Sequence, residues 1–141
     1  RNNLVYVPQG NTLFSGTVRE NLLMGDPEAG DRQMWAVLDV AEAGFVRSLP
    51  GGLDARIGEI GAGLSEGQAQ RIAIARGLLR PGSILLLDEF SSSLDQETER
   101  RLLKNLSENY GNKTIIFITH RDAVLDYCDA VLRLQTYSGS L

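Results

Sequence analysis

The chain has 141 residues, enough for about one domain, and 43% of them are hydrophobic with both signs of charge interspersed, which excludes a disordered chain. Its net charge of −4 gives no basic surface for nucleic acid, and its single cysteine excludes an internal disulfide. The sequence has no run of about 18 apolar residues, so we expect no segment of this chain to cross a membrane by itself.

The N-terminal half of the chain predicts a short strand followed by helices. Residues 3–10 alternate in polarity and end in proline and glycine, which is typical of a short strand. Residues 16–25 and 31–44 have helical patterns, and Asp31 is expected to cap the second helix. Residues 49–63 are rich in glycine and predict a loop.

A longer helix is predicted from Glu66 to about Leu79. Ser65, with Gln68 three residues later, matches a capping box, in which each side chain binds the backbone of the other residue. Residues 83–89 then form an apolar run that ends in two carboxylates, as in a strand covered on both faces within a parallel sheet.

The C-terminal part continues the alternation of helix and strand. We expect a helix over residues 95–110, a strand over 114–120, a helix over 121–128 and a final strand over 129–135. This alternation indicates the α/β class with an open parallel sheet, whose ligands bind beyond the carboxyl ends of the strands.

Polar residues stand at those strand ends. Asp88 and Glu89 end one strand, and His120 ends the next. A Mg²⁺-dependent NTPase places an acidic pair in this way, to hold the metal and activate water, and a histidine there can stabilise a transferring phosphate. The same residues are compatible with two solvated carboxylates and a histidine that caps a turn.

Two further positions are candidates for binding. Gln9 could bind metal or water through its amide, although a glutamine beside proline and glycine is also compatible with a plain loop. The helix start at Ser65 and Gly67 presents backbone N–H groups that attract an anion, but a capping box alone requires no ligand.

The order of these motifs resembles the nucleotide-binding domain of the ATP-binding-cassette (ABC) family. Gln9 resembles the Q-loop, LSEGQ at 64–68 the signature, ILLLDE at 84–89 the Walker B strand, SSLD at 92–95 the D-loop and ITH at 118–120 the H-loop. The resemblance covers almost the whole chain. It implies a P-loop NTPase (RecA-like) parallel sheet, incomplete here, with an inserted helical subdomain.

The resemblance also implies a domain division and a subfamily. The helical signature subdomain is expected over about residues 15–80, and the ATPase core over 1–14 and 81–141. Residues 12–25, TLFSGTVRENLLMG, resemble exporters, as does Glu59 in a short X-loop. The short separation of the Q-loop from the signature argues against the chromosome-maintenance relatives, which insert a long coiled coil there.

In the family, one set of residues acts on nucleotide bound within the same domain. The resemblance implies that Asp88 holds Mg²⁺ through water, Glu89 polarises the attacking water and His120 contacts the γ-phosphate of ATP. Gln9 is expected to sense metal and water while lying near the coupling helix of a transmembrane domain.

A second set is expected to act across a dimer interface. Ser65, Gly67 and Gln68 would contact ATP held by a second nucleotide-binding domain, and Asp95 would cross to that domain. The implied cofactors are therefore ATP and Mg²⁺, and the implied partners are a second nucleotide-binding domain and transmembrane coupling helices, without nucleic acid.

The sequence departs from the family pattern in two ways. Glu66 stands where the signature usually has glycine, and no G-x-x-x-x-G-K-[ST] loop or adenine-stacking A-loop aromatic is present. We therefore expect a C-terminal part of an exporter ATPase at the cytoplasmic face of the membrane, inactive on its own. The alternatives are a non-catalytic interaction or regulatory module and a soluble ABC ATPase without a transport role.

Overall fold

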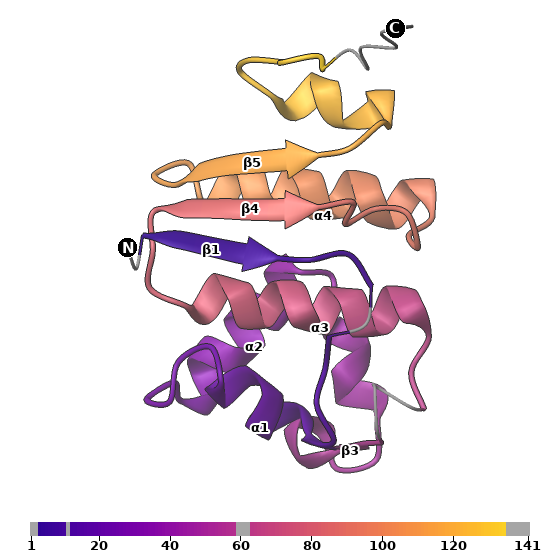
Figure 1. Ribbon diagram of the computed structural model, residues 1–141. Helices are drawn as coiled ribbons and strands as arrows, with labels where there is room; N and C mark the ends of the chain where they lie inside the picture. Colours follow the sequence, from indigo (N-terminus) through magenta and orange to yellow (C-terminus); the bar gives the residue numbers. More distant parts are fainter. Residues whose placement is uncertain (1–2, 11, 59–62, 135–141) are drawn as a thin grey trace, which may run out of the picture.

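The centre of the fold is a parallel β-sheet (Figure 1). A computed structural model describes residues 3–10, 12–58 and 63–134 of the chain. Its three-stranded sheet has the order β1-β4-β5, formed by β1 (Leu4–Val7), β4 (Ile84–Asp88) and β5 (Thr114–Ile118), with both neighbouring pairs parallel. The predicted α/β class and parallel sheet are confirmed.

Helices and short elements make up the rest of the described fold. The α-helices are α1 (Val18–Leu23), α2 (Asp31–Val40), α3 (Glu66–Leu79) and α4 (Gln96–Asn109). A small antiparallel pair joins β2 (Gly16–Thr17) to β3 (Arg56–Ile57), and 3₁₀ helices form η1 (Gly44–Ser48), η2 (Gly52–Asp54) and η4 (Asp122–Tyr127).

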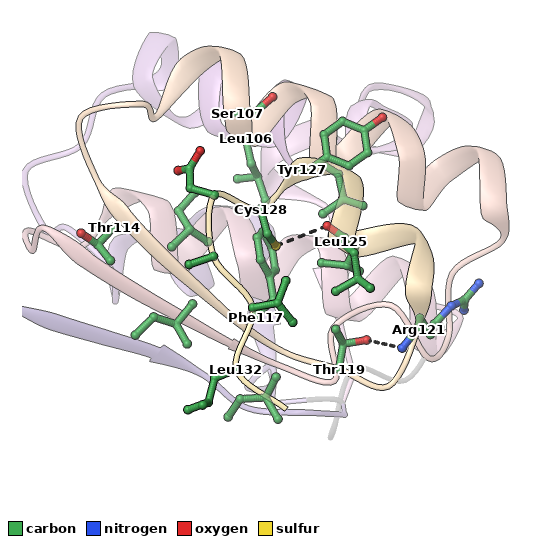
Figure 2. Close-up of a pocket in the computed structure, with 18 of the residues that line it drawn as sticks. Leu106, Ser107, Thr114, Phe117, Thr119, Arg121, Leu125, Tyr127, Cys128 and Leu132 are labelled. Atoms are coloured by element: carbon green, nitrogen blue, oxygen red, sulfur yellow. Dashed lines mark hydrogen bonds between the residues drawn. The ribbon is translucent and has the colours of Figure 1, made fainter. Parts of the chain in front are cut away.

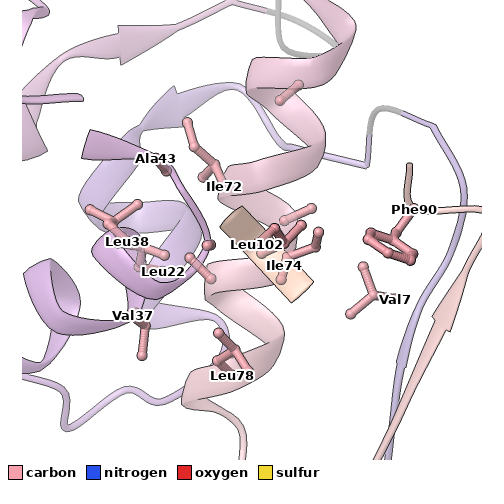
Figure 3. Close-up of a cluster of buried hydrophobic side chains, with 14 of the residues drawn as sticks. Val7, Leu22, Val37, Leu38, Ala43, Ile72, Ile74, Leu78, Phe90 and Leu102 are labelled. Carbon is pink, nitrogen blue, oxygen red and sulfur yellow. The ribbon is translucent and has the colours of Figure 1, made fainter. Parts of the chain in front are cut away.

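The helix α3 is the central packing element. It contacts β1 on one side and α1 and α2 on another, so that Leu22 and Leu38 lie on one side of it and Val7 and Phe90 on the other (Figures 1 and 3). Its Gly77 lies so near β1 that a Cβ there would be 2.7 Å from Val7 Cγ2. Small residues on this helix therefore allow it to lie directly against the sheet.

Only one face of the sheet is covered by the described residues. Leu85 and Leu87 of β4 are buried, whereas Leu4, Tyr6, Ile116 and Ile118 on neighbouring strands are 53%, 49%, 45% and 45% exposed. The expectation that the strand at 83–89 is covered on both faces is therefore wrong for this part of the chain. A continuous apolar run shows that a strand is hydrophobic, but it does not show which face of the strand is covered by other elements.

The helical predictions need corrections in their bounds and in one helix type. Residues 16 and 17 form β2 and not helix, and α2 stops at Val40 and not at residue 44. Asp31 is the first residue of α2, and the cap is Gly30, whose backbone N–H donates to Gln33 Oε1 at 3.0 Å. Within the predicted helix at 121–128, residues 122–127 form the 3₁₀ helix η4 in place of an α-helix.

The predicted final strand is also wrong where it is described. Residues 129–134 are irregular, and Gln135 lies outside the described residues. A strand needs a neighbour for its backbone hydrogen bonds, and within the described part of the chain β5 pairs only with β4. The predicted loop at 49–63 contains η2 and β3, while Glu59 lies outside the described residues.

Candidate functional site

The carboxyl ends of β4 and β5 bring an acid and the only histidine of the chain together. The register pairs Asp88 with Ile118, and the Glu89 N–H donates to the Ile118 carbonyl at 2.8 Å. Beyond that bond, His120 Nδ1 lies 3.3 Å from the Glu89 carboxylate. Sequence reasoning placed these side chains at one edge, and the parallel register puts Glu89 and His120 in contact.

The backbone of Glu89 is strained. Its φ is 49°, in the left-handed region that non-glycine residues rarely occupy, and such a residue costs on the order of 1–3 kcal/mol. The side chain of Glu89 is 25% exposed, whereas that of His120 is 80% exposed. Strain of this kind persists only where the surrounding structure holds it, and it is common at functional sites.

Asp88 has a partner that sequence reasoning missed. Tyr6 Oη donates a hydrogen bond to Asp88 Oδ2 at 2.9 Å. That hydrogen bond, with added effects of desolvation and of the carboxylate charge, raises the pKa of the Tyr6 phenol. Tyr6 pairs with Leu86 in the register, so Asp88 follows two residues later on the same face. The alternation of β1 was the signal that could have found this pair.

Gln9 follows the end of β1 and is exposed at the same edge of the sheet. Side chains of α3 hold the chain on both sides of it. Gln70, which is buried, donates to the Pro8 carbonyl at 3.4 Å, and Arg76 donates to Thr12 Oγ1 at 2.8 Å. These hydrogen bonds therefore hold the segment that contains Gln9 against α3, the helix that begins at the signature.

The predicted capping box is confirmed. The Ser65 N–H donates to Gln68 Oε1 at 3.0 Å, and the Gln68 N–H donates to Ser65 Oγ at 3.1 Å. Ser65 is exposed and its oxygen is the acceptor in this box. A hydroxyl also carries one donor, so its proton remains available for an acceptor such as a phosphate oxygen.

Gly67 has a packing role in the structure. A Cβ at this buried position would lie 2.7 Å from the Ser93 carbonyl oxygen and 3.4 Å from Leu94 Cδ2. The start of α3 therefore lies against the turn that follows Glu89. No hydrogen bond between described residues joins Gln9 or Ser65 to the Asp88 and Glu89 carboxylates.

Asp95 caps the helix α4. Its carboxylate accepts hydrogen bonds from the Thr98 N–H at 2.7 Å and from Thr98 Oγ1 at 3.0 Å. These bonds, the backbone one first, hold the pKa of Asp95 below its ordinary value. The Asp95 side chain is exposed, but its carboxylate is already hydrogen-bonded to Thr98 within this chain.

Asp95→Asn removes the charge of this cap but keeps its shape, since asparagine caps helices about as well as aspartate. A carboxyl with a depressed folded-state pKa stabilises the fold above its unfolded pKa and loses that contribution as the pH falls through the folded pKa. We expect the variant to be less stable at pH 7, with the difference shrinking as the pH falls below 3.8, the ordinary value for this group. Urea unfolding from pH 7 to pH 3 measures this, with Asp126→Asn as the control. A difference independent of pH would contradict it.

Metal ligands are sparse in the described part of the chain. No group of three or more His, Cys, Asp or Glu side chains among those residues could hold a metal ion. Mg²⁺ is commonly bound through one or two carboxylates, with water and substrate phosphates completing its shell. Asp88 fits that mode of binding, in which a nucleotide supplies the remaining ligands.

One cavity lies away from most of the predicted site residues. A cavity of about 1200 Å³ lies between β5, α4 and the segment that follows His120, and its lining is mainly apolar (Figure 2). His120 borders it, whereas Asp88, Glu89 and Ser65 do not. The candidate site is therefore the open edge of the sheet and not this cavity.

No helix in the described residues has the length and apolar character needed to span a bilayer.

Comparison with known proteins identifies relatives. The family described as "ABC transporter" matches residues 1–92. The chain is 43% identical over 130 residues to a probable multidrug resistance ABC transporter ATP-binding/permease protein of Bacillus subtilis, covering 90% of this chain and 22% of that protein. It is 43% identical over 136 residues to a glutathione/L-cysteine transport system ATP-binding/permease protein of Haemophilus influenzae, covering 96% of this chain and 23% of that protein.

A solved structure agrees with these relatives. The chain matches a bacterial Atm1-family ABC exporter with ATP bound, with a TM-score of 0.82 and 36% identity, over 89% of this chain and 22% of that one. This chain therefore spans between a fifth and a quarter of the length of these relatives. The match confirms the predicted P-loop NTPase fold.

Proposed function

This chain belongs to the ABC transporter family, and from that membership we propose that it forms part of the ATP-hydrolysing domain of an exporter. The parent reaction is hydrolysis of ATP coupled to movement of a substrate across a membrane. The observation that carries the proposal is the 3.3 Å contact between Glu89 and His120, directly beside Asp88 at the carboxyl edge of the sheet.

Glu89 is proposed to orient and deprotonate the attacking water. An ionised carboxylate accepts about four hydrogen bonds, and His120 supplies only one of them. The remaining sites on the partly exposed carboxylate are available to a water molecule. The strained backbone of Glu89 supports this role, because strain of this kind is common at functional sites.

His120 is proposed to contact the γ-phosphate, and Asp88 to hold Mg²⁺ through water. Because Nδ1 of His120 faces Glu89, Nε2 is the ring nitrogen left for a phosphate oxygen, and donating to both acceptors requires the doubly protonated ring. When bound, Mg²⁺ neutralises charge on the phosphates. Tyr6 donates to Asp88 and so fixes the direction of that carboxylate. Gln9, at the end of the neighbouring strand, is proposed to sense metal and water.

The signature residues are proposed to act on nucleotide held by a second domain. Ser65 offers a hydroxyl proton, and the exposed start of α3 offers backbone N–H groups with the positive end of the helix dipole. Gly67 and Gln68 lie in that first turn. Asp95, at the end of the turn that contacts Gly67, is proposed to reach the same partner.

The proposed setting is the cytoplasmic face of a membrane. The helical part, about residues 15–80, and the core, residues 1–14 and 81–141, would form one half of an ATP sandwich, with Gln9 near a coupling helix of the transmembrane domain. The retained set of Gln9, Ser65, Asp88, Glu89 and His120 favours an ATPase over a non-catalytic interaction module. The exporter relatives favour transport over a soluble ABC ATPase.

The test is ATP turnover by the full-length polypeptide that carries this chain, purified in detergent or lipid. We expect turnover that requires Mg²⁺ and is abolished by EDTA, because positioning and charge neutralisation supply most of the catalysis in phosphoryl transfer. Absence of Mg²⁺-dependent turnover in a folded, ATP-binding preparation would reject the proposal.

The 141-residue chain alone is expected to hydrolyse no ATP above background. Its sequence has no G-x-x-x-x-G-K-[ST] loop, and without that backbone cradle and lysine the β- and γ-phosphates lose most of their positioning. A phosphate-release assay measures this. Turnover by the chain alone that is abolished by Glu89→Gln would contradict the expectation.

A further inference from the structure

Arg121, the residue after His120, makes contacts that the proposed mechanism does not use. Its Nη1 donates to the Ser91 carbonyl at 2.9 Å, and its Nε lies 3.1 Å from Glu99 Oε2 on α4. The Glu99 side chain is 1% exposed, although glutamate is among the residue types least often buried.

The ion pair is the principal compensation for this buried carboxylate. Glu99 Oε2 accepts no hydrogen bond of good geometry among the described residues, so the nearby guanidinium is its charge partner. Removing one member of a buried pair leaves an uncompensated charge and is strongly unfavourable. The position of Arg121 is therefore tightly constrained by the start of α4.

The same guanidinium connects the two segments that carry the candidate catalytic residues. Ser91 follows Glu89 by two residues, and Arg121 follows His120 directly. Beyond the bond from the Glu89 N–H to the Ile118 carbonyl, no backbone hydrogen bond among the described residues joins these two segments.

Local contacts also fix the segment of His120. The Arg121 N–H donates to Thr119 Oγ1 at 3.0 Å, as Figure 2 shows. The His120 side chain itself is 80% exposed and makes only its contact with Glu89 among the described residues. Its placement must therefore come from the backbone on either side of it.

We propose that the buried pair of Arg121 and Glu99 positions His120 against Glu89. Both are positioning residues, since neither lies at the site of the reacting atoms. Their effect on turnover rests on the proposed function, whereas their effect on the geometry of His120 does not. A purely structural pair would instead stabilise the fold without a specific link to His120.

The first arm of the test uses the 141-residue chain, in which His120 is the only histidine. Imidazole NMR signals then report this ring alone. We expect the nuclear Overhauser contact between the His120 ring and the Glu89 side chain to be lost in Arg121→Met and in Glu99→Gln, and partly kept in Arg121→Lys. Arg100→Met, which removes an exposed ion pair with Glu97 on the same helix, is the matched control and should keep the contact.

The second arm uses turnover of the full-length protein. If Arg121 acts through His120, Arg121→Met should lower turnover by about 10-fold, as for other residues that orient an active group. In a His120→Ala background the same change should cost less than about twofold, because coupled residues are not additive. Arg121→Lys should restore part of the loss.

The two arms separate the two proposals. An unchanged His120–Glu89 contact in folded Arg121→Met, or equal loss of turnover in both backgrounds, overturns the positioning role. Absence of turnover in the parent, or no effect of His120→Ala, rejects the proposed function while the NMR arm still decides the geometry. If Arg121→Met does not fold, Glu99→Gln and Arg121→Lys decide the NMR arm.

Discussion

Glu89→Gln in the full-length protein is expected to lower ATP turnover by about 10²-fold or more while leaving ATP binding intact. Glutamine has the shape of glutamate but cannot take a proton from water. Because the Glu89 side chain is partly exposed and His120 is its one polar partner among the described residues, the substitution removes the base while keeping the shape of the side chain. A group that acts mainly in the transition state changes turnover and not ground-state affinity.

Turnover and nucleotide binding must therefore be measured on the same preparations. Glu108→Gln, at an exposed position near the end of α4, is the matched control and should change neither quantity. Asp88→Asn provides the contrast, since loss of the proposed metal-holding carboxylate should weaken Mg²⁺-dependent binding as well. Equal losses of binding and turnover in Glu89→Gln would make Glu89 a metal-holding or structural residue.

Gly67→Ala is expected to destabilise the fold by about 1–3 kcal/mol, the usual cost of forcing a methyl group into a packed site. The new Cβ would lie 2.7 Å from the Ser93 carbonyl oxygen, which is backbone and cannot move aside like a flexible side chain. The turn is also held at its C-terminal end, by buried Leu94 and by the hydrogen bonds of Asp95 to Thr98. Either α3 or the turn after Glu89 must shift.

Urea unfolding of the 141-residue chain measures this cost. Gly111→Ala is the control, because the nearest atom to its Cβ would be 3.9 Å away. In the full-length protein, Gly67→Ala should also lower turnover, since the displaced turn follows the proposed base. If both alanine variants change stability equally, Gly67 has no packing role, and its place in the signature depends on ligand contact alone.

Sequence by itself determined the elements whose hydrogen bonds are local. The start of the helix at 66–79 was predicted because Ser65 and Gln68 close a capping box within four residues, and its end because Pro81 and Gly82 follow. The strands predicted to end at Glu89 and His120 end one and two residues earlier, at Asp88 and Ile118, where the hydrophobic runs stop. The family motifs added the expected roles, which remain predictions for the individual residues.

Tertiary structure decided every contact between segments that are distant in the chain. Strand register placed Tyr6 beside Asp88, and helix packing placed Gly67 against Ser93 and Glu99 beside Arg121. The predicted strand at 129–135 was wrong where it is described, because β-propensity cannot supply the neighbour that a strand must pair with. Local patterns specify a backbone conformation, whereas these contacts depend on which surfaces meet when the whole chain packs, and that information lies in no single stretch of sequence.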